Sequence, residues 1–279
     1  MNIDLHVHSN YSDGSMSPTE LVQVAARIGL AAIAITDHDT VDGVDEAVAA
    51  GEGLGVEVVP GLELSVTCDE SSVHLLGYFC SPRAPRLQEV LSRLQEGRRN
   101  RNTLILARLN ELGIDITAAE LAAVSGHGQS GRPHIATLLV RKGAVSSMDE
   151  AFCNYLGRGA KAYQPRYILD AAEAIAVVKE AGGLAVLAHP QQLEKAGKDV
   201  SAMVRRLHCL GLDGVEAYYP THSRAFRKKL LAMARRYDLV VTGGSDYHGA
   251  IRPGTSLASG ATAVPGHLLE AMKTRLGMA

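Results

Sequence analysis

The sequence contains no tryptophan and only three phenylalanines among its 279 residues. Its four cysteines are scattered and form no CxxC pair, which argues against a disulfide framework and favours free thiols in a reducing compartment. It has no run of about 18 apolar residues, so no membrane-spanning helix is predicted. The formal net charge of −2 gives no overall attraction to nucleic acid or membranes, and any recognition of anions must therefore be local.

The composition is that of a globular enzyme with a sizeable core. Hydrophobic residues make up 46% of the chain, and its length suits one large α/β barrel or two ordinary domains. Because candidate functional histidines, His6 and His8, stand close to Met1, we expect no cleaved leader peptide and a cytoplasmic location.

Short strand-like segments alternate with amphipathic helical segments over most of the chain. Ser17, Pro18 and Glu20 have the spacing of a helix start with a capping box. Repeated alternation of this kind predicts a mostly parallel sheet, either open or closed into a barrel. We expect strands at 3–8, 31–36, 56–60, 73–79, 184–188, 214–217, 240–243 and 259–264, and helices at 18–28, 41–54, 171–181, 200–210, 224–237 and 266–275.

Residues 87–167 break this alternation. They contain no clear strand, and glycine- and serine-rich joints separate helical segments expected at 87–112, 118–124, 132–142 and 148–156. Because alternating segments flank the stretch on both sides, we interpret it as a helical insertion that covers one mouth of a barrel. The predicted organisation is a barrel of residues 1–86 and 168–279 with an inserted helical cap subdomain of residues 87–167.

Histidine and carboxylate side chains follow several of the predicted strands. His6 and His8, two residues apart on the first strand, point to the same face and can chelate one ion. In a barrel of alternating strands and helices, the carboxyl ends of the strands meet at one face, where sites are built. Nitrogen and carboxylate oxygen are ligands that borderline divalent metals prefer. The nine candidate metal ligands are His6, His8, Asp13, His38, Glu63, His74, His189, Asp246 and His248.

Nine candidates exceed the roughly four to six ligands that one ion takes, so two or three ions about 3.5–4 Å apart are expected. Each residue alone has a simpler explanation: a single histidine on an apolar strand, such as His74, is more often a hydrogen-bonded core residue. The common position at strand ends favours the metal site. Asp37 and Asp39 are interpreted as groups that orient ligands or cap a helix, and Asp4 as a partner for an imidazole N–H.

The segments DLHVHSNYSDG, ITDHD, LAHP and SDYH, together with Glu63 and His74, resemble the motifs of the PHP (polymerase and histidinol phosphatase) phosphoesterases over residues 3–248. The resemblance implies an α/β fold, a distorted (β/α)7 TIM-like barrel, with a trinuclear metal site. The implied ligand sets are His6, His8, Glu63 and Asp246 for one ion, Glu63, His74 and His189 for a second, and Asp13, His38 and His248 for the third.

Two or three divalent ions would favour a phosphate substrate. Three ions carry more positive charge than Asp13, Glu63 and Asp246 remove, and the remainder attracts a phosphomonoester. The ligand set, without thiolate, favours Mn²⁺, with Fe²⁺ or Zn²⁺ as alternatives. The expected reaction is attack on phosphorus by a hydroxide held between metals. The acid that protonates the leaving group stays open between a metal-coordinated water, His134 and His222.

The helical insertion, with its GRPHIA segment, resembles the branch of the family that hydrolyses nucleoside 3′,5′-bisphosphates and, in some members, trims short RNA from the 5′ end. That resemblance implies a small nucleotide substrate, with the 5′ phosphate cleaved at the metals, and short RNA as a further substrate. Arginine suits phosphate contact, although a solvated charged face is the simpler alternative. The candidate substrate-binding residues are Arg98, Arg101, Asn102, Arg132, His134, Arg158 and Lys161.

Other functions stay open on the sequence alone. The same chemistry on histidinol phosphate is the nearest alternative. A carbon–nitrogen hydrolase of the amidohydrolase type also begins with HxH, but no lysine is suitably placed for its bridging ligand. A catalytically silent barrel used for protein association is a third alternative, which metal analysis would test. The sequence indicates no membrane contact and no stable protein partner.

Overall fold

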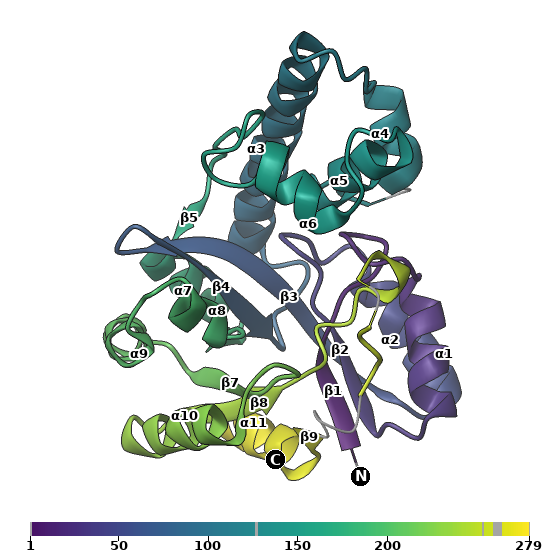
Figure 1. Cartoon of the computed structure of the whole chain (residues 1–279). Coiled ribbons are helices and arrows are strands. Elements are labelled where there is room, and N and C mark those ends of the chain that lie inside the picture. The colour runs from purple at the N-terminus through teal and green to yellow at the C-terminus, as the bar shows by residue number, and fades with distance from the viewer. Residues whose placement is uncertain (1, 126–127, 253, 259–263, 279) are drawn as a thin grey trace.

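The computed structural model describes residues 2–125, 128–252, 254–258 and 264–278. Its centre is a sheet in which eight strands follow the order β8-β7-β6-β4-β3-β2-β1-β9, while β5 pairs with β3 beside this path (Figure 1). The strands are β1 (Asn2–Val7), β2 (Ala32–Ile35), β3 (Glu57–Cys68), β4 (Ser71–Tyr78), β5 (Leu169–Asp170), β6 (Leu184–Leu187), β7 (Gly214–Tyr218), β8 (Val240–Gly243) and β9 (Val264–Pro265).

Seven of these strands, β1 to β4 and β6 to β8, form a nearly closed barrel. The chain that follows β8 returns to the end of β1: the Asp246 amide donates to the His6 carbonyl at 2.8 Å, and the His8 amide donates to the Tyr247 carbonyl at 2.9 Å. This pairing joins the two ends of the sheet at the mouth where the candidate ligands lie. The predicted distorted barrel is therefore confirmed, and its closure places the first and last motifs side by side.

The sheet is mostly parallel, as predicted, but β4 runs antiparallel to both β3 and β6. The strand expected at 56–60 continues to Cys68, and the turn to β4 passes through Asp69 and Glu70, whose φ angles are 46° and 62°. Pro60 and Gly61 have the composition of a turn, which obscured the period-two pattern of the following residues. The prediction that Glu63 follows a strand is wrong, because it lies within β3.

Helices cover the outside of the barrel close to the positions predicted. The capping box at Ser17 is present, with the Ser17 hydroxyl accepting from the Glu20 amide. Residues 259–263 of the last expected strand lie outside the described residues, and β9 includes Val264. The barrel helices are α1 (Pro18–Arg27), α2 (Val44–Leu54), α7 (Ala171–Glu180), α8 (Gln191–Lys195), α9 (Val200–Cys209), α10 (Arg224–Arg236) and α11 (His267–Arg275), with a 3-10 turn at Gly249–Ile251.

The helices between β4 and β5 gather above the barrel (Figure 1). The long α3 joins the two parts, because Leu87 and Leu94 pack in the barrel core whereas Ile105 and Leu109 pack in a separate cluster. No helix in the described ranges is long and apolar enough to cross a membrane. The helical segments are α3 (Pro85–Glu111), α4 (Ala118–Ser125), α5 (Arg132–Arg141), α6 (Met148–Ala151) and a π-helical turn (Phe152–Leu156).

We refer to residues 87–167 as the cap and predict that its separate core carries its stability. Leu109 is fully buried in that core, whereas Leu104, on the same helix, is 52% exposed. Leu109→Ala should lower the free energy of unfolding by about 2–5 kcal/mol, and Leu104→Ala should change it by less than about 0.5 kcal/mol. Denaturant unfolding followed by circular dichroism measures both values. Equal values for the two variants would contradict a cap with its own packed core.

Candidate metal centre

The nine candidate ligands meet at the mouth of the barrel, around the carboxylate of Glu63. His6 and His8 come from the end of β1, Glu63 from the middle of β3, and His74 from β4, while the others stand on loops that follow strands. Glu63 lies on the inner face of β3 because its neighbours Leu62 and Leu64 point outward into the core. The side chains of His6 and His8 are 0% exposed, whereas His38 and His74 are 15% and 28% exposed, so the cluster opens on the side of His38 and His74.

Glu63 is surrounded by five imidazole rings. Its Oε1 atom lies 2.8 Å from both His74 Nδ1 and His189 Nε2. Its Oε2 atom lies 3.4 Å from His6 Nε2 and 3.2 Å from both His8 Nε2 and His38 Nδ1. A carboxylate with two oxygens turned to different sets of rings can bridge two cations.

Two further carboxylates lie on either side of His8 and His248. The Asp13 Oδ1 atom is 3.4 Å from His248 Nε2 and 3.8 Å from His8 Nδ1. The Asp246 Oδ1 atom is 3.2 Å from His8 Nε2 and 3.5 Å from His6 Nε2. Three sets of candidate ligand atoms are each compact enough for one ion: His8, Asp13, His38 and His248; His6, His8, Glu63 and Asp246; and His38, Glu63 and His74.

The charge states of the carboxylates and of His38 suit cations, whereas the carboxylates around His6 and His8 outweigh burial and raise the pKa of both rings, that of His8 to about 10. Burial alone would raise the pKa of Glu63, but the surrounding imidazoles, His74 first, hold it well below its usual value. The same balance holds for Asp13, next to His38 and His248, and for Asp246, next to His6 and His8. Burial lowers the pKa of His38 to about 3. Ionised carboxylates and a neutral imidazole are the forms that coordinate metals.

Several buried polar atoms of the cluster have no hydrogen-bond partner among the described residues. They are His8 Nδ1, His8 Nε2, His38 Nδ1 and Asp13 Oδ1. A buried polar atom without a partner costs about 1–3 kcal/mol, so such atoms need an explanation. Their convergence on one small volume, together with the nitrogen and carboxylate donor set, fits bound divalent ions.

A buried glutamate behind the cluster, Glu216 on β7, was not found from the sequence. Its Oε1 atom is 2.9 Å from His6 Nδ1, and its Oε2 atom accepts from the His189 backbone amide at 2.6 Å. Glu216 thereby fixes the ring of one candidate ligand and the backbone of another, where His189 has the uncommon φ of 27°. Only the alternation along β7, which turns Glu216 toward the barrel interior, could have indicated it.

The aspartates beside the motifs have roles that differ in part from those predicted. Asp37 accepts from the hydroxyls of Ser9 and Ser12, and thus fixes the loop that carries Asp13. The predicted role of Asp4 is wrong: it accepts from the backbone amides of Ser245 and Ala258, and the imidazole partner is Glu216 instead. Asp4 thus holds the closing loop through main-chain amides.

Asp246 is held from the opposite side by two residues not found from the sequence. Its Oδ2 atom accepts from the Tyr219 hydroxyl at 2.7 Å and from Arg252 NH1 at 2.6 Å. These bonds leave Oδ1 turned to His6 and His8. His222, an open candidate for the leaving-group acid, lies behind Tyr219, with ring centroids 5.1 Å apart, and its Nδ1 is 3.0 Å from the Ala217 carbonyl.

Arginines of the cap gather beside His38, where two of them pair with the carboxylate of Asp39. The Asp39 Oδ2 atom is 2.6 Å from Arg98 NH2 and 3.2 Å from Arg166 NH2, and both arginine side chains are nearly buried. Burial and the nearby charges of Arg98, Arg166 and Arg132 lower the pKa of Arg101. We call Arg98, Arg101, Arg132 and Arg166 the arginine cluster; Arg166 was not found from the sequence.

The remaining candidates of the cap differ in position. Asn102 holds Arg101 by accepting from its guanidinium at 2.8 Å, and donates to Ser130. His134 is buried, and its Nδ1 accepts from the Gly131 amide, which leaves Nε2 as the donor of the neutral ring. Lys161 is exposed on the surface, with Nζ 5.5 Å from the centre of the Tyr155 ring.

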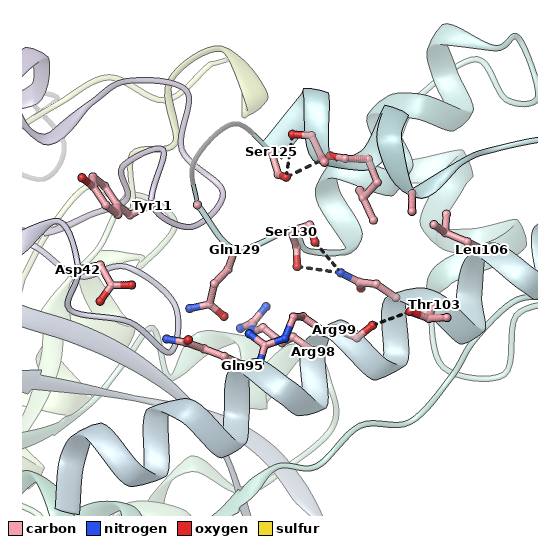
Figure 2. A pocket seen from close by; sticks show the side chains of 15 residues that line it. Tyr11, Asp42, Gln95, Arg98, Arg99, Thr103, Leu106, Ser125, Gln129 and Ser130 are labelled. Atoms are coloured by element: carbon pink, nitrogen blue, oxygen red, sulfur yellow. Dashed lines mark hydrogen bonds between the residues drawn. The ribbon is translucent and has the colours of Figure 1, made fainter. Parts of the chain in front are cut away.

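One cavity adjoins the arginine cluster at Arg98, and a second adjoins the metal centre. The first, of about 520 Å³, lies at the seam between cap and barrel, where Arg98 and Arg99 of α3 face the loop with Gln129 and Ser130 (Figure 2). The other, of about 330 Å³, reaches His74 and His189 and includes Arg158. Arg158 thus lies at a different opening from the arginine cluster.

Comparison with known proteins agrees with this geometry. Residues 4–182 match the PHP domain family. The chain is 35% identical to a 5′-3′ exoribonuclease of Haemophilus influenzae (88% of this chain, 89% of the relative), and 32% identical to a 3′,5′-nucleoside bisphosphate phosphatase of Chromobacterium violaceum (88% and 87%).

Two further likenesses extend the comparison. The chain is 36% identical to a phosphoribosyl 1,2-cyclic phosphate 1,2-diphosphodiesterase of Eggerthella lenta (88% of this chain, 94% of the relative). A crystal structure from Bifidobacterium adolescentis, described as a metal-dependent phosphoesterase, superposes with a TM-score of 0.90 at 32% identity and covers 98% of this chain and 96% of that one. The likenesses extend over the barrel and the cap together.

We predict that Glu216 positions the metal ligands. Glu216→Gln removes the charge that orients His6 and should weaken Mn²⁺ binding by about 10- to 100-fold with the fold retained, as measured by isothermal titration calorimetry and circular dichroism. Glu180→Gln, an exposed change outside the cluster, is the matched control and should leave Mn²⁺ affinity unchanged. Unchanged affinity in Glu216→Gln would contradict this role.

Proposed function

The chain belongs to the PHP family and is a metal-dependent phosphoesterase, and we propose that it hydrolyses one phosphate ester of a ribose that carries two phosphates, such as a nucleoside 3′,5′-bisphosphate. In this proposal Glu63, His74 and His189 hold one ion, and the sets around Asp246 and Asp13 hold the other two, as the family resemblance implies. Bound divalent ions would supply an activated water and positive charge beside the phosphoryl oxygens. Six imidazoles and three carboxylates without thiolate favour Mn²⁺.

The observation that carries the proposal is the arginine cluster. Two of the four guanidinium groups, those of Arg98 and Arg166, pair with the Asp39 carboxylate in a nearly buried site beside His38. Among the described residues, Arg101 and Arg132 pair with no carboxylate: Arg101 donates to Asn102, and Arg132 donates to the Leu156 carbonyl. Such crowding of like charge is unfavourable unless an anion joins it, and a guanidinium fork suits a phosphate. We therefore assign the cluster to the second phosphate of the substrate, the one that is not hydrolysed. The cavity of about 520 Å³ beside it has the size of a small-molecule site.

The names of the relatives indicate which phosphate lies at the metal centre and which at the arginine cluster. A 5′-3′ exoribonuclease must hydrolyse the ester on the 3′ side of the first nucleotide, and the Eggerthella name describes a phosphoribosyl group with a cyclic phosphate. We therefore place the 3′ phosphorus at the metals and the 5′ phosphate on the arginine cluster, instead of the 5′ phosphate at the metals as expected from the sequence. Water adds to phosphorus, the bond to O3′ breaks, and O3′ takes a proton.

His134 contributes to this arrangement from the cap. Burial lowers its pKa, so the ring is neutral, and its Nδ1 is occupied by the Gly131 amide. The Nε2–H group is thus fixed as a donor. The ring lies close enough to Asp13 and Arg98 for both charges to affect its pKa. We assign His134 to a hydrogen bond with the substrate between the two phosphates. We place the reaction in the cytoplasm, where nucleotides and RNA fragments arise.

A panel of adenosine phosphates tests the proposal. With Mn²⁺, kcat/KM for adenosine 3′,5′-bisphosphate should exceed that for 3′-AMP by about a hundredfold, about 2.7 kcal/mol, because only the former contacts the arginine cluster. The nucleoside product should be 5′-AMP, identified by chromatography. Formation of 3′-AMP would reverse the placement, and better turnover of histidinol phosphate would refute the nucleotide assignment.

Two single substitutions on α5 test the proposed binding site for the second phosphate. Arg132 begins this helix, and its NH1 donates to the Leu156 carbonyl, whereas Arg141 is exposed at the opposite end. Arg132→Ala should raise KM for adenosine 3′,5′-bisphosphate by about tenfold or more and change kcat/KM for 3′-AMP by less than about twofold. Arg141→Ala, the control, should change neither. Equal losses on both substrates in Arg132→Ala would remove Arg132 from this role.

A further inference from the structure

An exposed basic surface on α8 and α10 has no role in the reaction as proposed so far. It consists of Lys195 and Lys198, at the end of α8 and in the following loop, and of Arg224, Arg227 and Lys228 at the start of α10. Arg227 is half-buried, with its guanidinium 5.1 Å from the centre of the Tyr218 ring, whereas the other four are exposed. We call these five residues the α8–α10 surface. Residues 191–237 contain ten lysines or arginines and four acidic residues, whereas the whole chain contains 28 lysines or arginines and 30 acidic residues.

The basic residues at the start of α10 occupy electrostatically unfavourable positions. Its thirteen residues include six basic ones, three of which lie in the first five positions, and no acidic one. Positive charge at a helix N-terminus opposes the helix dipole, and the like charges of Arg224 and Lys228, four residues apart, repel each other. In the described part of the chain, no carboxylate lies within 4.0 Å of either side chain. Basic residues at an unfavourable helix terminus, with no carboxylate partner to compensate them, indicate a function.

A cavity links this surface to the metal centre. The cavity of about 330 Å³ reaches His74 and His189, and Lys198 and Gln192 line it on the side of α8. Helix α8 contacts α10 through Lys229 and Glu194, whose charged atoms are 3.7 Å apart. The loop before α10 contacts α8 through a 2.8 Å hydrogen bond from Thr221 to Gln191. Lys198 therefore belongs both to the cavity lining and to the α8–α10 surface, and α8 lies against the start of α10.

This opening lies on the side of the metal centre formed by His74 and His189, whereas the arginine cluster lies beside His38, around Asp39. If the 5′ phosphate of the first nucleotide is held at the cluster, the chain beyond the reacting phosphorus must leave from the other side of the metals. That side is the cavity with Arg158 and Lys198.

We propose that the α8–α10 surface binds the single-stranded RNA that continues beyond the scissile phosphate, with its phosphates on Lys198, Lys195, Arg224 and Lys228 in turn. The proposal rests on the proposed function and its placement of the two phosphates. Lysine and arginine on a surface contact phosphates without reading bases, so binding is independent of sequence and sensitive to salt. The hydrolysed strand keeps its 5′ phosphate and can enter the site again.

Charge reversal at the two ends of α10 tests the proposal. The test variant is Arg224→Glu with Lys228→Glu; the control is Arg235→Glu with Arg236→Glu, exposed residues at the other end of the same helix. For 5′-phosphorylated oligoribonucleotides of four to eight nucleotides, the test variant should lower kcat/KM by about tenfold or more and the control by less than about twofold. Neither should change kcat/KM for adenosine 3′,5′-bisphosphate by more than about twofold.

Thermal unfolding excludes a folding defect as the cause. Acidic residues at the N-terminus of α10 interact favourably with the helix dipole, so the Tm of the test variant should equal or exceed that of the wild type. The Tm of the control variant should not exceed that of the wild type. Raising salt from about 50 to 200 mM should lower the wild-type rate on oligoribonucleotides more steeply than that of the test variant.

The outcomes separate the two proposals. If the wild type hydrolyses the bisphosphate but not the oligoribonucleotides, or if the test variant loses both activities equally, the RNA surface is overturned while the proposed function stands. Equal salt dependence in wild type and test variant also overturns it. If the wild type hydrolyses neither substrate, the proposed function itself fails.

Discussion

The candidate metal centre depends on one buried carboxylate, Glu63, and on the positive charge that compensates it. Five imidazoles surround this side chain, which is 1% exposed. A buried carboxylate is costly unless positive charge compensates it, and the rings can compensate it either as imidazolium or through bound metal. The length of β3 follows from this constraint, because only a strand that continues past the barrel edge carries Glu63 to the centre while Leu62 and Leu64 pack outside.

Asp39 joins the metal centre to the cap. It directly follows the candidate ligand His38 and adopts a φ of 54°, which turns its side chain toward the cap. Its carboxylate contacts Arg98 and Arg166, and its carbonyl accepts from Gln95 and Gln129. An anion on the arginine cluster competes with Asp39 for the same guanidinium groups. Binding of a phosphate at the arginine cluster, as proposed, is therefore coupled to the position of the cap and of His38.

The sequence was sufficient for the candidate ligands but not for the groups that orient them. His6, His38 and Asp246 could be found because ligands at strand ends stand in short, recognisable segments, and the barrel then brings the strand ends together. Glu216, Arg166 and Arg252 lie in segments of ordinary composition, and each acquires its role from a partner far away in the chain. Lys161 shows the converse, since a lysine just after the glycines of the GRGAK segment suggested a substrate contact but lies exposed beside Tyr155.

The two proposed anion-binding regions differ in what they can discriminate. The arginine cluster is enclosed and nearly buried. In the proposed function it would select a phosphate at a fixed distance from the metal centre, because a substrate without that phosphate would leave buried positive charge uncompensated. The α8–α10 surface is exposed, so its contribution grows with each further phosphate and falls with salt. One site with these two regions accounts for relatives named for a bisphosphate, a cyclic phosphate and RNA. In this proposal the enclosed region selects the ribose end, and the exposed region sets the length of the chain that follows it.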